Sequence, residues 1–223
     1  MNNAVAVDVL PVVGIDFGRR RIRAALYSHG DPKSDLFDGK DYIVSHVCIR
    51  ERNISFTYGT EKRTTHRNAY CFYDIRDRLG TDGFEVNATG RVELIPAKYV
   101  ASAIFEEIKN SIEYHKSGIR DIVLTVPLDS TLAYRTDLIY AAEIQGFNVI
   151  SMISEPAAMA CEFNHFTGEK RHLKRFVDAT CIITYCLSED GYECSLIKMK
   201  DKDYTLLASC HDHRIEGFPF REL

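Results

Sequence analysis

The sequence of 223 residues contains no tryptophan and no long apolar run. No stretch approaches the roughly 18 consecutive apolar residues of a membrane-spanning helix, and no basic segment precedes an apolar one near the start, as it does in secretory signals. The chain is also without a strong charge of either sign, because its formal net charge is −4. The sequence therefore predicts a cytoplasmic chain, which can also be nuclear, with neither a membrane nor a nucleic acid as a partner.

Cysteines are present in an odd number, seven, but none of them forms a C-x-x-C pair. This pattern favours reduced, mostly buried thiols over a disulfide framework or a zinc site. His211 and His213, beside Cys210 and Asp212, form the strongest metal-ligand pattern. A histidine pair at this spacing is usually solvated, so the sequence predicts no metal site of this kind.

The first part of the chain has the pattern of β-hairpins. Residues 12–17 and 22–27 are apolar runs on either side of a basic tip, and residues 42–49 and 54–58 read as two further strands. Residues 59–96 are polar and read as a surface excursion with a short helix near 68–78.

The middle of the chain alternates helix and strand, which is typical of a sheet covered by helices. An amphipathic helix runs from Pro96 to Gly118, and helices over 131–145 and 155–163 follow it. Continuous apolar strands are predicted over 122–126, which we expect to be buried on both faces, and over 147–153. An antiparallel meander is then predicted from three segments: 181–186, 192–198 and 205–209.

Three motifs stand in this order: Gly14-Ile15-Asp16-Phe17-Gly18, Leu124-Thr125-Val126-Pro127 and Ile153-Ser154-Glu155-Pro156-Ala157-Ala158. With their spacing, the chain resembles the nucleotide-binding domain of the 70-kDa heat-shock chaperones from about Val12 to Phe220. The resemblance implies an α/β fold: an actin-like ATPase lobe of the ribonuclease-H-like type, with a mixed five-stranded sheet and helices.

The same resemblance implies the domain organisation. It places an N-terminal tail at 1–11, one lobe at 12–223 and a small inserted subdomain at about 35–100. Only the first lobe of the family's domain is expected here, without the second lobe, the peptide-binding domain or the lid.

The first phosphate-binding hairpin of that family matches residues near the start of the chain. Asp16 and Gly18 stand at matching positions, and Arg19 and Arg20 replace a pair of hydroxyl residues. Two guanidinium groups can attract a phosphate, but they are bulky where the backbone must approach it. The alternative interpretation is a solvated hairpin tip.

Two further catalytic positions follow from the resemblance. The family's lysine that touches the γ-phosphate falls at Arg76, with Arg78 as the alternative, and Glu155 matches the carboxylate that holds the water shell of magnesium. Arginine does not reproduce the compact ammonium group. Without the resemblance, these residues read as a helix-face arginine and as a favourable charge at a helix start.

Pro127 and Arg135 match the family's switch, which passes the nucleotide state to the surface.

The second phosphate hairpin departs from the pattern of an aspartate, three glycines and a threonine. Cys186, residues 188–190 and Gly191 occupy those places, and two of them bring carboxylates. Like charges and side chains close to phosphates oppose binding, so we expect weak or lost binding of ATP or ADP with magnesium.

The resulting expectation is a truncated, diverged heat-shock-70-like protein, related to chaperones and to the stress response. It would be a pseudoenzyme without ATP hydrolysis that acts as a binding or regulatory module for co-chaperones or other chaperone-family proteins. One alternative is an ATP-binding, nucleotide-hydrolysing lobe that assists protein folding. Another is a relic without function, or an incomplete gene model.

Overall fold

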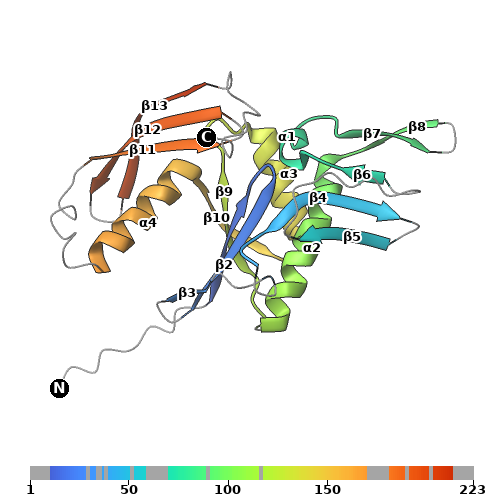
Figure 1. Ribbon diagram of the computed structural model, residues 1–223, viewed down its shortest axis with the longest axis horizontal. Helices are drawn as coiled ribbons and strands as arrows, with labels where there is room; N and C mark the ends of the chain where they lie inside the picture. Colours follow the sequence, from blue (N-terminus) through green and yellow to red (C-terminus); the bar gives the residue numbers. More distant parts are fainter. Residues whose placement is uncertain are drawn as a thin grey trace. The chain divides into compact units, whose positions relative to one another are not determined.

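The computed structural model describes residues 11–28, 31–33, 37, 40–50, 53–58, 70–88, 91–115, 118–169, 181–188, 191–200 and 203–212 (Figure 1). The predicted tail at 1–11 lies outside these residues except for Pro11. Contacts divide the chain into two compact units, Met1–Met152 and Ile153–Leu223. The single lobe over 12–223 and the inserted subdomain over 35–100 stay predictions.

A mixed β-sheet forms the centre of the first unit. Its strands are β1 (Val12–Phe17), β2 (Arg21–Ser28), β3 (Asp31–Lys33), β4 (Ile43–Arg50), β5 (Asn53–Tyr58), β6 (Tyr70–Phe72), β9 (Asp121–Val126) and β10 (Asn148–Ser154). The order is β10-β9-β1-β2-β4-β5, with β3 on β2 and β6 on β4. β1 pairs antiparallel with β2 and parallel with β9. The predicted mixed α/β sheet is therefore confirmed.

The predicted number of five strands is wrong, because eight strands belong to this sheet among the described residues. β3 and β6 have three residues each and contain charged or polar side chains. Segments this short do not show the alternation that identifies a strand in a sequence.

Two helices bury the apolar core of the first unit. The four-residue periodicity on α2 (Ala97–His115) is confirmed, since Val100, Ile104, Ile108 and Ile112 are all buried. α2 packs against α3 (Leu132–Glu143), which begins where the Thr131 side chain accepts a hydrogen bond from the backbone N–H of Tyr134. The periodic apolar residues therefore anchor α2 in the core.

The strand β9 is buried on one face only. Ile122, Leu124 and Val126 are buried, while the residues between them are half-buried. The prediction of burial on both faces is therefore wrong. β9 still lies inside the sheet, because it pairs with β10 on one side and with β1 on the other.

The sequence did not reveal the hairpin of β7 (Phe84–Ala88) and β8 (Arg91–Ile95). Most of β8 is exposed, with Val92 at 69% and Leu94 at 53%, so its apolar residues do not mark a buried face. The helix predicted near 68–78 is shorter, because α1 covers Ile75–Arg78 and follows β6. Among the helices that the structure describes, none has both the length and the hydropathy of a membrane span.

In the second unit, the described residues form one helix and a three-stranded antiparallel sheet. α4 (Glu155–Glu169) contacts all three strands of the sheet, β11 (Cys181–Ser188), β12 (Gly191–Lys200) and β13 (Asp203–Asp212), which follow one another in that order (Figure 1). The predicted meander is confirmed. The helix continues beyond the predicted end at residue 163.

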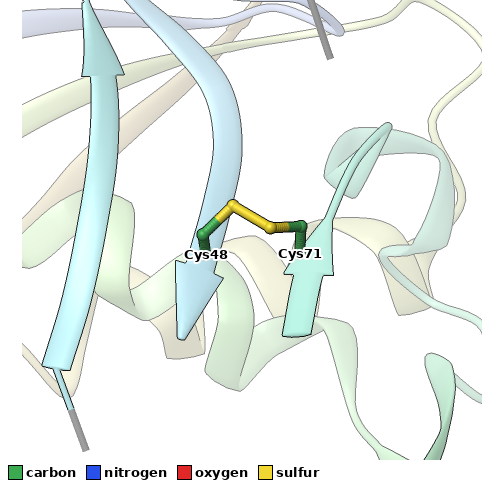
Figure 2. Close-up of a disulfide and its surroundings, with 2 residues drawn as sticks. All are labelled: Cys48 and Cys71. Atoms are coloured by element: carbon green, nitrogen blue, oxygen red, sulfur yellow. A yellow bond between two sulfur atoms is a disulfide. The ribbon is translucent and has the colours of Figure 1, made fainter. Parts of the chain in front are cut away.

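The cysteines differ from the prediction of reduced, mostly buried thiols. Cys48 and Cys71 form a disulfide between β4 and β6, with their Cα atoms 4.1 Å apart (Figure 2). The other described cysteines are half-buried or exposed: Cys161, Cys181, Cys186, Cys194 and Cys210. Residue counts cannot reveal such a pairing, because it depends on the register between two strands.

Candidate functional site

The carboxylate of Asp16 is held by two neighbours at the end of β1. Thr125, which follows the parallel pair Ile15 and Leu124, donates a hydrogen bond of 2.8 Å from its Oγ1 to Oδ1 of Asp16. Arg23 lies opposite on β2, with its Nη1 3.6 Å from Oδ2. The carboxylate is therefore oriented by a hydroxyl group and lies beside a guanidinium group, in a pair that water still reaches.

The turn between β1 and β2 requires glycine at position 18. A Cβ atom on Gly18 would collide with the backbone carbonyl oxygen of Arg21. This explains why a glycine stands there even if no phosphate binds. The match of Gly18 to the phosphate hairpin therefore has a structural reason of its own.

Arg19 at the hairpin tip is paired with α1 and the residue before it. Its Nε lies 2.8 Å from Oδ2 of Asp77 and 3.8 Å from Oδ1 of Asp74. The Arg19 side chain is 21% exposed, so these contacts are partly shielded from water. Sequence reasoning left Arg19 open between a phosphate contact and a solvated hairpin tip, and it did not identify these two carboxylates as its partners.

A pocket of about 240 Å³ lies beside this ion pair. It is lined by Arg19, Arg20, Val44, Ser45, His46, Tyr73 and Asp74. The backbone N–H of Ser45 donates to the carbonyl of Arg20 over 2.8 Å, which joins β4 to the hairpin tip. The Ser45 hydroxyl is buried without a hydrogen-bond partner. Ser45 therefore lines the pocket, but its hydroxyl oxygen is not accessible to a ligand without a local movement.

Two aromatic rings stiffen the same pocket. His46 is buried, and its ring centre lies 5.2 Å from that of Tyr73. The Cys48–Cys71 disulfide joins the strands that lead to these two residues. Sequence reasoning identified neither His46 nor Tyr73. Ser45 and His46 are two polar residues inside the otherwise apolar strand β4, and they were a usable signal for the first of these positions.

Neither predicted counterpart of the catalytic lysine lines this pocket. Arg76 is half-buried on α1, and the segment reaches the pocket through Tyr73 and Asp74 instead. The guanidinium of Arg78 lies 6.0 Å from the ring centre of Phe84. The catalytic assignment of Arg76 stays a prediction.

The two predicted switch residues are connected through Ser130. The backbone N–H of Ser130 donates to the carbonyl of Pro127 over 3.1 Å. The Nε of Arg135 donates to the Ser130 hydroxyl over 2.9 Å. The structure brings Pro127 and Arg135 together in this way, and their switching role stays a prediction.

The remaining predicted residues belong to the second unit. Glu155 is the first residue of α4 and is half-buried. Cys186 lies opposite Glu193, and Ser188 pairs with Gly191 at the end of the hairpin. Residues 189 and 190, which bring the two carboxylates, lie outside the described residues.

The residues at the first hairpin do not fit a magnesium nucleotide as they stand. Asp16 is paired with Arg23, and Arg19 is paired with Asp77 and Asp74, so a phosphate or a hydrated cation would have to displace protein contacts. No group of three or more possible metal ligands occurs among the described residues. His211 is exposed on β13, and His213 lies outside the described part.

Comparisons with known proteins give one consistent result. A family model described as Hsp70 protein matches residues 53–222. A chaperone protein HscA homolog of Rickettsia africae is 24% identical over 220 residues, which cover 92% of this chain and 35% of that protein. Heat shock 70-related protein 5 of Dictyostelium discoideum is 28% identical over 140 residues, 61% of this chain and 27% of that protein. The chain spans about a quarter to a third of the length of these relatives.

Proposed function

Because the chain belongs to the Hsp70 family, with a match over residues 53–222, we propose that it is a chaperone-related binding or regulatory module. Its fold is the mixed α/β fold of an Hsp70 actin-like ATPase lobe. In this proposal, binding of ATP or ADP with magnesium is weak or lost, and ATP hydrolysis is absent.

The pairing of Arg19 with Asp77 and Asp74 is the observation that carries the proposal. The family's hairpin holds phosphates with backbone N–H groups and hydroxyls, whereas Arg19 extends toward two carboxylates. To reach a phosphate, its guanidinium would have to give up these charge-assisted contacts. Exchanging one anion for another leaves little net gain for the ligand.

Asp16 supports the same conclusion. A magnesium ion with its water shell would have to compete with Arg23 for one oxygen of the Asp16 carboxylate, while the other oxygen accepts a hydrogen bond from the Thr125 hydroxyl. Cys186 adds to this, because it replaces the second hairpin's carboxylate. Positions 16 and 186, where the family resemblance implies contacts to magnesium, are therefore both poorly suited to hold the ion.

The connection of Pro127, Ser130 and Arg135 supports the binding role. In the family, residues at two of these positions pass the nucleotide state to the surface. We infer that this chain binds co-chaperones through the surface at Pro127, Ser130 and Arg135. The partner is then recognised without a nucleotide cycle.

An ATP-binding lobe is the second candidate function. The pocket beside the hairpin favours it, because Arg20 lines the pocket and its guanidinium group can attract a phosphate. In that case Arg20, which lines the pocket, would orient the phosphates by charge, and Asp16 would help to hold the magnesium ion that accompanies them. The nucleotide with its magnesium ion would supply the chemistry.

Calorimetry with Mg-ATP and Mg-ADP separates the two candidates. We expect no binding heat and no thermal shift at millimolar nucleotide. A nucleotide that did bind and was present at 100 times its Kd would stabilise the folded state by about 2.7 kcal/mol, which a thermal shift would reveal. Micromolar binding that disappears in Asp16→Ala would overturn the proposal. The matched variant Arg19→Thr with Arg20→Thr restores the hydroxyl pair and tests whether affinity returns.

The partner is tested separately with purified family co-chaperones. The proposal expects saturable binding that does not change when nucleotide is added. Arg135→Ala should weaken it, and Arg120→Ala, at an exposed position just before β9, serves as the control. Absence of binding to each class of co-chaperone would refute the partner role.

A further inference from the structure

Two cysteines of the second unit face each other across neighbouring strands. Cys194 on β12 pairs in register with Cys210 on β13. Both are free thiols. Neither belongs to a motif that the resemblance assigns, and neither has a place in the proposed function.

The register alone brings their side chains within bonding reach. Residues directly opposite on antiparallel strands have Cα atoms about 4.5 to 5.5 Å apart, and their side chains point to the same face of the sheet. Disulfides usually join Cα atoms that are about 4.4 to 6.8 Å apart. Directly opposite positions therefore fall within the range of Cα separations that disulfides join.

The first unit contains the same arrangement in its oxidised form. Cys48 and Cys71 are also opposite each other on antiparallel strands, and they are joined (Figure 2). In the second unit, Cys186 is opposite Glu193 and Cys181 is opposite Lys198. Among the described cysteines, Cys210 is thus the one that the sheet register places opposite Cys194.

Solvent reaches the pair from the edge of the sheet. β13 is the outer strand in the order β11-β12-β13, and Cys210 is exposed on it. Cys194 is half-buried on the middle strand, where Tyr185 lies opposite it on the other side. A small oxidant can therefore reach Cys210 first, with Cys194 placed to react next.

We propose that Cys194 and Cys210 form a reversible dithiol–disulfide site in the second unit. The Cys210 thiolate attacks one sulfur of oxidised glutathione, forms a mixed disulfide and releases one glutathione thiolate. The Cys194 thiolate then attacks Sγ of Cys210 and releases the second. The two cysteines are oxidised and lose two protons, and one oxidised glutathione becomes two reduced molecules.

The bond would tie the edge strand to the middle strand. β12 and β13 shift register between Leu196 and Ile197, close to the pair, so the link would hold the strands beside an irregular part of their ladder. This site goes beyond the proposed function, because it needs neither a nucleotide nor a co-chaperone.

The test equilibrates the whole chain in glutathione buffers of increasing oxidised fraction and then blocks the remaining thiols with an alkylating agent. Peptide mass spectrometry should find Cys194 linked to Cys210 at oxidising ratios, with the link reversed by excess reduced glutathione. Cys210→Ser and Cys194→Ser should each abolish this link. The matched variant Cys181→Ser, at an exposed position on β11, should keep it.

A second measurement covers variants that fold poorly. Dibromobimane becomes fluorescent when it joins two adjacent thiols, so the reduced natural sequence should yield a Cys194–Cys210 adduct. Complete separate alkylation of both cysteines at the most oxidising ratio, with no bimane adduct, would overturn the proposal. A link from Cys194 to any other cysteine would overturn it as well.

Discussion

The Nε atom of Arg19 lies 2.8 Å from Oδ2 of Asp77, so the tip of the first hairpin is bound to helix α1. Asp74, immediately before that helix, lies 3.8 Å from the same nitrogen and has a left-handed backbone conformation with φ of 51°. Both carboxylates thus meet a guanidinium at a position where the family has a hydroxyl. The Arg19 guanidinium would therefore have to leave both carboxylates to reach a phosphate.

Asp77→Asn should weaken this connection. The Asp77 side chain is 40% exposed, so we expect a loss of no more than about 1 kcal/mol in the free energy of unfolding. The loss should shrink in high salt, because exposed charges are screened. Urea unfolding at two salt concentrations measures it, with the exposed residue Asp82→Asn as the control. An equal loss in both variants would show that the ion pair contributes nothing.

Gly18→Ala should destabilise the first unit by about 1 to 3 kcal/mol through backbone displacement. The added Cβ would meet the carbonyl oxygen of Arg21, whereas at Gly14, on the strand β1 that precedes the turn, the nearest backbone atom is 4.0 Å away. Gly14→Ala is therefore the matched control and should be neutral or slightly stabilising. Thermal unfolding compares the two, and a similar Tm for both would contradict the predicted collision.

Phe105→Ala should be the most damaging of these changes, with a loss of about 3 to 5 kcal/mol. The Phe105 ring stacks on Phe17 at 5.5 Å between centres and contacts Phe147 at 6.2 Å, so it joins α2 to the sheet core. Glu106→Ala, at the next and exposed position, should change stability by about 0.5 kcal/mol or less. Chemical unfolding measures both, and a small effect of Phe105→Ala would contradict the packing.

Reduction of the Cys48–Cys71 disulfide should lower the free energy of unfolding by about 3 kcal/mol, since the bond closes a loop in the unfolded chain over a sequence separation of 23. Unfolding with and without a reductant measures the loss. The double variant Cys48→Ser with Cys71→Ser should lose this dependence, and Cys181→Ser should keep it. Alkylation of both Cys48 and Cys71 without a reductant would contradict the bond.

Cys161 should react slowly with iodoacetamide near pH 8. Burial raises the pKa of its thiol, and a hydrogen bond with Tyr204 opposes this only in part. A raised pKa leaves less thiolate at a given pH, so the midpoint of the alkylation rate should lie above the ordinary thiol value of about 8.5. Rates measured by peptide mass spectrometry over a pH series test this. A midpoint at or below the ordinary value would contradict it.

Much of the fold could be predicted because it depends on local patterns. The first hairpin, the buried stripe of α2 and the meander of the second unit follow from apolar periodicity, which reports the backbone geometry of each segment. The motifs around Asp16, Pro127 and Glu155 were sufficient to identify the family. The β7–β8 hairpin was missed because its exposed strand has no buried face to mark it.

The sequence by itself therefore determined the order of most elements and the family. Only the tertiary structure decided the partners of the site residues: Asp77 for Arg19, Arg23 and Thr125 for Asp16, and Cys71 for Cys48. Local periodicity cannot reveal these contacts, because they join segments far apart in the chain. They form only when strand register and helix packing bring those segments together.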